Sequence, residues 1–308
     1  PYWFSEEKRV ARLLLFSVVA LTLSIVYMEV LFNRWNNDFY NSLQDKKQAE
    51  FFRLIGWFGW YALLWIIMQV YRQYLSQMLQ IRWRRWLTDR YLGDWLRDRA
   101  YYRMQLTDQG TDNPDQRIAD DLRLFVEQTL SLALGLLDAV VTLVSFVVIL
   151  WGLSGILSFS LFGQALAVPG YMVWVALVYA ALGSWLVHFV GRPLIGLNFN
   201  QQRYEADFRF SLVRFRENTE GVALYKGEVQ EMEGFRTRFS TLLENFKRIM
   251  IQAKRLTWFT AGYNQVAIIF PYVVAAPRYF SGAIQLGGLM QTASAFNQVR
   301  VALSWFIN

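Results

Sequence analysis

The chain has 308 residues, of which 55% are hydrophobic, whereas soluble domains contain roughly 45–50% apolar residues. It has no cysteine and one histidine, His188, which excludes disulfides and cysteine-based metal sites and argues against histidine-based catalysis. The net charge of +7 fits nucleic acid or an anionic membrane surface, and the placement of the charges described below favours the membrane.

Long runs without charged residues recur along the chain and predict membrane-spanning helices. The first covers residues 13–28 and extends to about residue 32, which is enough to cross roughly 30 Å of hydrocarbon as an α-helix. Between residues 139 and 191 there is no Asp, Glu, Lys or Arg, which leaves room for two spans and a glycine-containing loop at about residues 152–170. We therefore expect six spans, at about residues 13–32, 54–71, 125–151, 171–190, 256–277 and, truncated, 286–308.

Two charged segments with helical periodicity separate these spans, at about residues 72–124 and 191–256. Together with residues 1–12 they hold 25 of the 31 lysines and arginines, whereas the connections on the other side hold five. Because positively charged connections stay in the cytosol, the N-terminus and both segments are predicted to be cytosolic. We expect an all-α, multi-pass membrane protein with two long cytosolic helical excursions.

The sequence contains no motif for catalysis within this chain. A G-x-x-x-x-G-K-[ST] phosphate loop is missing, as are an H-E-x-x-H pair and a Cys/His ligand set. His188 lies near the expected end of the fourth span and is interpreted as a hydrogen-bonded polar group. We expect no catalytic, cofactor-binding or metal site in these residues, and no nucleic-acid partner.

Ionisable and amide side chains within the predicted spans are the candidates for a polar cavity. Charges are costly inside a membrane, so they usually line a water-filled cavity or pair with one another. Asp138 sits deepest in its span and is expected to line a cavity, whereas Glu29 and Glu127 lie near span ends, where a solvated role is equally compatible. The remaining candidates, of which the amides also suit hydrogen bonds between helices, are Asn264, Gln265, Gln291, Asn297 and Arg300. Most aromatic residues are interpreted as interfacial belts and core packing.

A long amphipathic segment, residues 194–233, lies in the second excursion. Its apolar residues, such as Leu197, Tyr204 and Phe208, are three, four or seven apart, which is the spacing of one helix face. Gly221 and Gly227 interrupt the pattern, and we expect them to permit a turn. The segment thus predicts a helix that leaves the membrane, turns and returns.

Several stretches resemble one family of membrane proteins, in the same order along the chain. Residues 217–228, ENTEGVALYKGE, resemble the cytosolic coupling segment of ABC transporter membrane domains, in the form found in YddA-like proteins and peroxisomal fatty-acyl-CoA transporters. Residues 111–121 contain N-P-D-Q-R-I, which is similar to a motif of the same transporters. Residues 35–44, 82–96, 197–213 and 286–308 are similar to segments of the SbmA/BacA peptide-uptake family. The matched motif residues are Asn113, Pro114, Asp115, Gln116, Arg117, Gln202, Arg203 and Glu205.

The resemblance implies the membrane domain of a homodimeric transporter with an ABC exporter-type fold. Such a protein would use ATP to move peptides or other bulky hydrophilic solutes across the bacterial inner membrane by alternating access. A nucleotide-binding domain that binds ATP and Mg²⁺ is expected after the truncated sixth helix, so that the full-length protein hydrolyses ATP. The tips of the two excursions would dock on that domain through Tyr101, Tyr102, Arg103, Glu217, Glu220, Gly221, Tyr225, Gly227 and Glu228.

Three further hypotheses stay open, and the first is a proton-driven importer. SbmA/BacA proteins lack an ATPase domain, are thought to run on the proton gradient, and diverge from this chain at N-P-D-Q-R-I and at the coupling segment. Because this chain keeps both elements, it is more similar to the ATP-driven branch; in a proton-driven importer, Glu205 would be the leading proton carrier. The second hypothesis is a transporter of acyl-CoA or lipid, and the third is an anchor or receptor subunit without transport.

Overall fold

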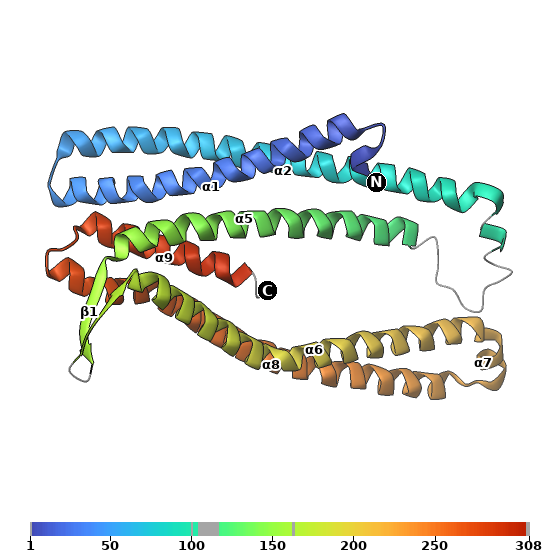
Figure 1. The fold of residues 1–308 in the computed structure, drawn as a ribbon. Helices are drawn as coiled ribbons and strands as arrows, with labels where there is room; N and C mark the ends of the chain where they lie inside the picture. Colours follow the sequence, from blue (N-terminus) through green and yellow to red (C-terminus); the bar gives the residue numbers. More distant parts are fainter. Residues whose placement is uncertain (1, 100, 104–116, 162–163, 306–308) are drawn as a thin grey trace. The chain divides into compact units, whose positions relative to one another are not determined.

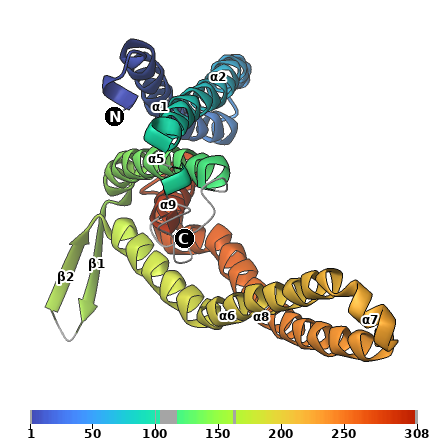
Figure 2. The same cartoon turned by 90° about the vertical axis from the view of Figure 1, so that its right-hand side faces the viewer.

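The computed structural model describes residues 2–99, 101–103, 117–161 and 164–305, and for residues 156–161 and 164–166 the backbone alone. These residues form long helices and one β-hairpin (Figures 1 and 2). The chain divides into two compact units. Unit 1 comprises residues 1–177 and 271–308, and unit 2 comprises residues 178–270.

Unit 1 contains most of the elements. They are η1 (Tyr2–Phe4), α1 (Lys8–Gln44), α2 (Gln48–Leu96), η2 (Arg97–Arg99), η3 (Arg117–Asp121), α5 (Leu122–Ser154), β1 (Ile156–Leu161), β2 (Gln164–Pro169) and α9 (Leu286–Trp305). Two further helices, α6 (Tyr171–Glu217) and α8 (Glu228–Phe280), have one end in unit 1 and run through unit 2, where α7 (Thr219–Tyr225) joins them.

Five helices of the described chain are long and apolar enough to cross a membrane: α1, α2, α5, α6 and α8. α5 continues from η3, and each of the five contains one of the spans expected from the sequence. α9 lies where the truncated sixth span is expected, and it is not among the five. Its polar side chains, including Gln291, Asn297 and Arg300, lower its hydropathy, so the sixth span stays a prediction.

The core of unit 1 forms where α1 packs against α2, α5 and α9 (Figure 1). Leu14, Val18 and Ile25 are buried in α1, and their spacing of four and seven residues places them on one helix face. Phe16 and Tyr27 lie on other faces of the same helix and stay exposed. An apolar helix with one buried face and other exposed apolar faces is what a membrane environment requires, since lipid covers the rest.

The N-terminal residues close one end of the α1, α2 and α5 group. Tyr2 is 1% exposed, and its ring stacks 6.1 Å from Trp83 of α2. Val126 and Leu130 of α5 belong to the same buried cluster. By the orientation expected from the sequence, this aromatic cluster lies near the cytosolic side.

A β-hairpin follows α5, where the sequence predicts only a loop. β1 and β2 pair antiparallel, with Ile156 opposite Pro169 and Leu161 opposite Gln164. Gly155 and Gly170 flank the hairpin with φ of 64° and 63°, the left-handed region that glycine tolerates best. The all-helical expectation therefore holds for the long elements and needs this one correction.

Unit 2 is a helical hairpin in which α6 and α8 run side by side and α7 closes the end (Figure 2). Ring contacts between Phe208 and Phe239, at 5.5 Å, and between Phe215 and Phe235, at 5.6 Å, join the two helices. The turn after α7 takes its left-handed residue from Lys226, with φ of 55°, and neither Gly221 nor Gly227 has a positive φ. The expectation that these two glycines permit the turn is wrong, because Gly221 is helical and Lys226 adopts the turn conformation itself.

Candidate functional site

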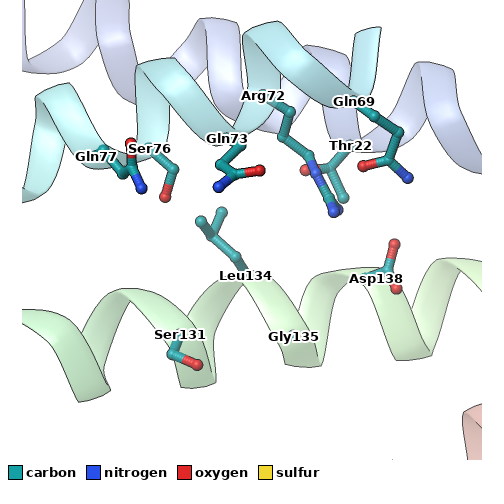
Figure 3. A pocket seen from close by; sticks show the side chains of 10 residues that line it. All are labelled: Thr22, Gln69, Arg72, Gln73, Ser76, Gln77, Ser131, Leu134, Gly135 and Asp138. Carbon is teal, nitrogen blue, oxygen red and sulfur yellow. The ribbon is translucent and has the colours of Figure 1, made fainter. Parts of the chain in front are cut away.

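A polar pocket of about 460 Å³ lies between α1, α2 and α5 in unit 1 (Figure 3). Its lining combines one arginine, one aspartate, three glutamine amides and three hydroxyls, all on helices apolar enough to cross a membrane. The lining residues are Thr22, Gln69, Arg72, Gln73, Ser76, Gln77, Ser131, Leu134, Gly135 and Asp138. Such groups in a membrane helix usually face water or a ligand.

Helical periodicity explains why these side chains meet. On α2, Gln69, Gln73 and Ser76 are four and three residues apart, so they share one face. On α5, Ser131 and Asp138 are seven apart and share a face with Leu134. Figure 3 shows the two rows opposite each other. Asp138 is predicted from the sequence and the α2 row is not, although the three-and-four spacing of the amides and hydroxyls in that row is a signal for it.

The charges of the polar pocket interact with one another. Arg72 and Asp138 extend from facing helices toward the space between them (Figure 3), and Asp138 interacts electrostatically with Arg72. Glu29 of α1 interacts electrostatically with both. Two carboxylates and one guanidinium therefore interact in this part of unit 1, with Arg72 at the border between the second predicted span and the predicted cytosolic excursion.

A second pocket, which we call the aromatic pocket, lies between α1, α2 and α9 and has a volume of about 570 Å³. Four aromatic rings and one carboxylate are the largest features of its lining. The lining residues are Glu29, Phe32, Asn33, Trp35, Asn36, Phe58, Ala62, Trp65, Ile66, Ser294 and Gln298.

The tip of unit 2 presents apolar side chains to solvent. Tyr225 at the end of α7 is 88% exposed, and Leu224 and Val229 are each 76% exposed. A Cβ added to Gly221, one turn before Tyr225, would meet no atom within 4 Å. Exposed apolar groups at a tip make it a candidate surface for binding another protein.

Behind the tip, α6 and α8 are joined by polar contacts. Asn245 of α8 donates from Nδ2 to the Leu197 carbonyl oxygen at 3.0 Å and to Gln201 Oε1 at 2.9 Å. Gln201 in turn donates to Glu205 Oε1 at 3.2 Å. A groove of about 560 Å³ nearer the tip is lined by charged residues of both signs, among them Asp207, Arg214, Glu231 and Arg238. These contacts fix the register of the hairpin that carries the exposed tip.

The sequence model of the ABC transporter transmembrane region 2 family matches residues 1–280. The chain belongs to this family. It is 37% identical over its full length to an inner membrane ABC transporter ATP-binding protein, YddA, of Escherichia coli, and covers 55% of that protein. It is 40% identical over 97% of its length to the chloroplastic ABC transporter D family member 2 of Arabidopsis thaliana, covering 40% of it. The lysosomal cobalamin transporter ABCD4 of Homo sapiens is 28% identical over 92% of this chain, which covers 44% of that protein.

The chain is thus a multi-pass membrane domain of an ABC transporter, and it spans about half the length of the curated relatives it matches. The family resemblance stated from the sequence motifs is confirmed for YddA and the D-type transporters. The resemblance to SbmA/BacA proteins stays a prediction.

Within this ABC membrane domain, the remaining intramembrane candidates take different positions. Gln291 is buried and exchanges hydrogen bonds with Asn33, and Arg300 donates to Asn297 Oδ1 at 3.0 Å. Glu127 is exposed and forms an ion pair with Arg123 at 3.4 Å. Asn264 and Gln265 lie on α8 in unit 2 and are exposed there. The structure therefore brings Asp138 and Glu29 to pockets, and gives Gln291 a contact between helices.

The expected coupling and motif residues are placed only in part. Tyr101, Tyr102 and Arg103 form a short helical stretch, with both tyrosines exposed. Asn113, Pro114, Asp115 and Gln116 lie outside the described residues, and Arg117 begins η3. Glu217, Glu220 and Glu228 are exposed around α7, as are Gln202, Arg203 and Glu205 on α6. Among the residues that the structure describes, no group of three His, Cys, Asp or Glu side chains could hold a metal ion.

Proposed function

We propose that this domain belongs to a homodimeric, ATP-driven transporter that moves peptides or other bulky hydrophilic solutes across the bacterial inner membrane by alternating access. The polar pocket is the observation that carries the proposal. Its amides, hydroxyls and opposite charges complement the carbonyl, amide and terminal charges of a peptide. A lipid or acyl chain would leave these groups without hydrogen-bond partners, at a cost in binding free energy.

The energy source in this proposal is a nucleotide-binding domain, with ATP and Mg²⁺, that docks on the tips of the excursions. The exposed Tyr225, Leu224 and Val229 would supply an apolar anchor surface, and the helical hairpin of α6 and α8 would transmit force into the membrane helices. The Escherichia coli relative is described as an ATP-binding protein, which supports the same interpretation. The docking residues at the first tip would be Tyr101, Tyr102 and Arg103.

A homodimer follows from the need to enclose a solute. One copy provides one set of polar-pocket side chains, and two copies facing each other would surround a pathway that neither forms alone. Six spans per copy, with α9 as the sixth, complete the proposed architecture. Purified full-length protein in nanodiscs should therefore show a mass of two copies by mass photometry.

The orientation in this proposal places the N-terminus and the tip of unit 2 in the cytosol. Because the chain has no cysteine, single cysteines report their side without background. Gln230→Cys, at the start of α8, should react with a membrane-impermeant thiol reagent only from the cytosolic side. Ser281→Cys, in the connection before α9, should react only from the outside. The opposite pattern would reverse the orientation.

Transport by the full-length protein in liposomes tests the function. Labelled peptide, and cobalamin because one relative is named a cobalamin transporter, are offered with ATP or with a proton gradient, each supplied alone. Uptake with ATP alone supports the proposal, and uptake with a proton gradient alone would favour the proton-driven importer, in which Glu205 is the first residue to test. An acyl-CoA transported in preference to both solutes would overturn the substrate class.

Variants of the polar pocket test whether transport depends on its charged side chains. Arg72→Gln and Asp138→Asn should each lower transport about tenfold or more, equivalent to about 1.4 kcal/mol. Arg72→Gln leaves the carboxylates of Glu29 and Asp138 without the cation near them, and Asp138→Asn removes the only negative charge among the described residues that line the polar pocket. The control is Arg85→Gln on the exposed part of α2, which removes an arginine outside the pocket. If Arg85→Gln also lost transport, the losses in Arg72→Gln and Asp138→Asn could not be assigned to the polar pocket.

A further inference from the structure

The aromatic pocket has an unusual combination of groups for a membrane helix bundle. Its lining includes Phe32, Trp35, Phe58 and Trp65, and Glu29 is the only charged side chain among the described residues that line it. A carboxylate set among aromatic rings is the chemistry by which proteins recognise organic cations, since the faces of the rings are electron-rich. We propose that the aromatic pocket binds an organic ammonium group, with Glu29 as its counter-ion and the rings as its walls.

The positions of the lining residues in the helices bring the carboxylate and the rings together. On α1, Glu29, Phe32 and Asn36 are three and four residues apart and occupy one face. On α2, Phe58 and Trp65 are seven apart, so both lie on the face turned to the same pocket. Ser294 and Gln298 of α9 complete the lining with a hydroxyl and an amide.

Contacts with the surrounding helices hold several walls in place before any ligand arrives. The Phe58 ring lies 5.7 Å from the Phe32 ring and 4.9 Å from the Trp35 ring. Trp35 Nε1 donates to the Leu54 carbonyl oxygen at 2.8 Å, which fixes its indole. Because the rings are already ordered, binding loses little side-chain entropy.

The neighbouring cations do not line this pocket. Arg72 interacts electrostatically with Glu29, but its side chain lines the polar pocket and also interacts with Asp138. Arg300 of α9 donates to Asn297. A positively charged ligand in the aromatic pocket would therefore gain attraction to Glu29 and to the rings, whereas an anion would be repelled by the carboxylate.

The ligand chemistry has two possible sources, a soluble solute with an amino or quaternary ammonium group and the headgroup of a lipid. The binding itself is independent of transport. The role of the pocket as a subsite for a transported solute rests on the proposed function, in which a peptide amino group would occupy it.

Ligand binding to the full-length protein tests the inference without ATP or transport. The probe is benzyltrimethylammonium, and its neutral carbon isostere neopentylbenzene has the same shape without the charge. Titrations are followed by saturation-transfer NMR on the protein in nanodiscs made only of phosphatidylglycerol. We expect the cation to bind at least about tenfold more tightly than the isostere, a difference of about 1.4 kcal/mol.

Variants locate the site. Glu29→Gln keeps the size of the side chain and should weaken cation binding at least about tenfold, whereas neopentylbenzene should bind the variant as well as before. Trp65→Leu should weaken both ligands and supplies a second readout if Glu29→Gln does not fold. Glu127→Gln is the matched control, since it removes an exposed glutamate that lies outside the lining of the aromatic pocket, and it should leave both affinities unchanged. Equal affinities for the cation and the isostere, or unchanged cation binding in Glu29→Gln, would overturn the inference.

Lipid composition separates the two sources. If the natural ligand is a lipid headgroup, phosphatidylethanolamine in the nanodiscs should compete with the probe and lower its apparent affinity, which supports the inference with a lipid ligand. If it is a soluble solute, the affinity should not depend on this lipid, which supports the inference with a solute ligand. If the protein binds the cation in the aromatic pocket but transports no cationic solute, the binding site is supported and only its proposed role in transport is overturned.

Discussion

Asn33 and Gln291, 258 positions apart in the sequence, exchange hydrogen bonds across the contact between α1 and α9. Gln291 Nε2 donates to Asn33 Oδ1 at 3.0 Å, and Asn33 Nδ2 donates to the Gln291 carbonyl oxygen at 3.2 Å. Both side chains are buried, at 2% and 7% exposure. The pair fixes the register of α9 on α1 beside the aromatic pocket.

Breaking one half of this amide pair should destabilise unit 1. Asn33→Leu and Gln291→Leu each leave a buried amide without its partner, which costs about 1–3 kcal/mol. The double variant should be less destabilised than the sum of the two single variants, because it leaves neither side chain unpaired. Thermal unfolding in detergent measures all four proteins of the cycle. Strictly additive effects would show that the pair contributes no coupling.

The first residues of α9 depend on the end of α1. Asn41 Oδ1 accepts from the Gly287 backbone nitrogen at 2.8 Å, and Gln44 Oε1 accepts from Leu286 at 2.7 Å, so α1 side chains satisfy free N–H groups of α9. A Cβ on Gly287 would collide with the backbone oxygen of Asn37, which cannot rotate away.

Gly287→Ala should therefore lower the unfolding temperature strongly, by an amount that corresponds to about 1–3 kcal/mol or more for overpacking. Gly288→Ala is the matched control, because its Cβ would lie 3.5 Å from Ile284 Cβ, an ordinary van der Waals contact. Similar unfolding temperatures for the two variants would show that α1 and α9 are not in close contact there.

Tyr2 allows a test at the N-terminal aromatic cluster. Its ring is buried, and among the described residues its hydroxyl has no hydrogen-bond partner. Burial raises the pKa of the Tyr2 phenol above its ordinary value of 10.0, and the Glu7 carboxylate adds to the rise. The folded state therefore favours the neutral phenol. The free energy by which burial of the neutral Tyr2 phenol stabilises the folded state is fully present below pH 10 and is lost as the pH rises through the raised pKa.

Tyr2→Phe should match the parent protein at neutral pH and be more stable above pH 10. Tyr2→Ala should lose about 3–5 kcal/mol at neutral pH and less above pH 10, where the parent protein itself loses stability. Thermal unfolding at neutral and alkaline pH measures the difference. Tyr91→Phe, at an exposed tyrosine of α2, is the control and should change neither value. A marked loss of stability in Tyr2→Phe at neutral pH would show that the hydroxyl is bonded.

The coupling proposal predicts the effect of a bulky residue at the tip of unit 2. Gly221→Trp should block docking of the nucleotide-binding domain, since Gly221 and Tyr225 are four apart on α7 and share a face. Substrate-stimulated ATPase activity and transport should fall together, while nucleotide binding persists. Both activities are measured on the full-length protein in liposomes.

Gly196→Trp supplies the control for this substitution. Gly196 lies on α6, far along the chain from the tip, and a Cβ there also meets no atom within 4 Å. The Gly196→Trp variant should insert into the membrane and retain both substrate-stimulated ATPase activity and transport. Normal transport by Gly221→Trp would show that the tip is a solvated turn and would end the coupling assignment.

Much of the architecture follows from the sequence alone. Uncharged runs such as residues 13–28 can lower their free energy only in lipid or in a protein core, so their length and composition predict the spans directly. The family could be stated from several motifs in the same order along the chain, including residues 111–121 and 217–228, since that resemblance depends on the order of residues and not on their contacts. Asp138 was found by the same reasoning, because an isolated charge in an apolar run is conspicuous.

Only the tertiary structure decided which polar and aromatic side chains meet. In the sequence, Glu29 is a residue near a span end, and Phe58 and Trp65 are two of many aromatic residues interpreted as belts or core packing. The packing of α1, α2 and α9 places all three around one pocket. The sequence leaves Gln291 open between lining a cavity and a hydrogen bond between helices, and the structure gives it Asn33, 258 positions away, as its hydrogen-bond partner. The periodicity of a helix predicts which of its own residues share a face, whereas the partner of that face depends on contacts between helices distant in the sequence.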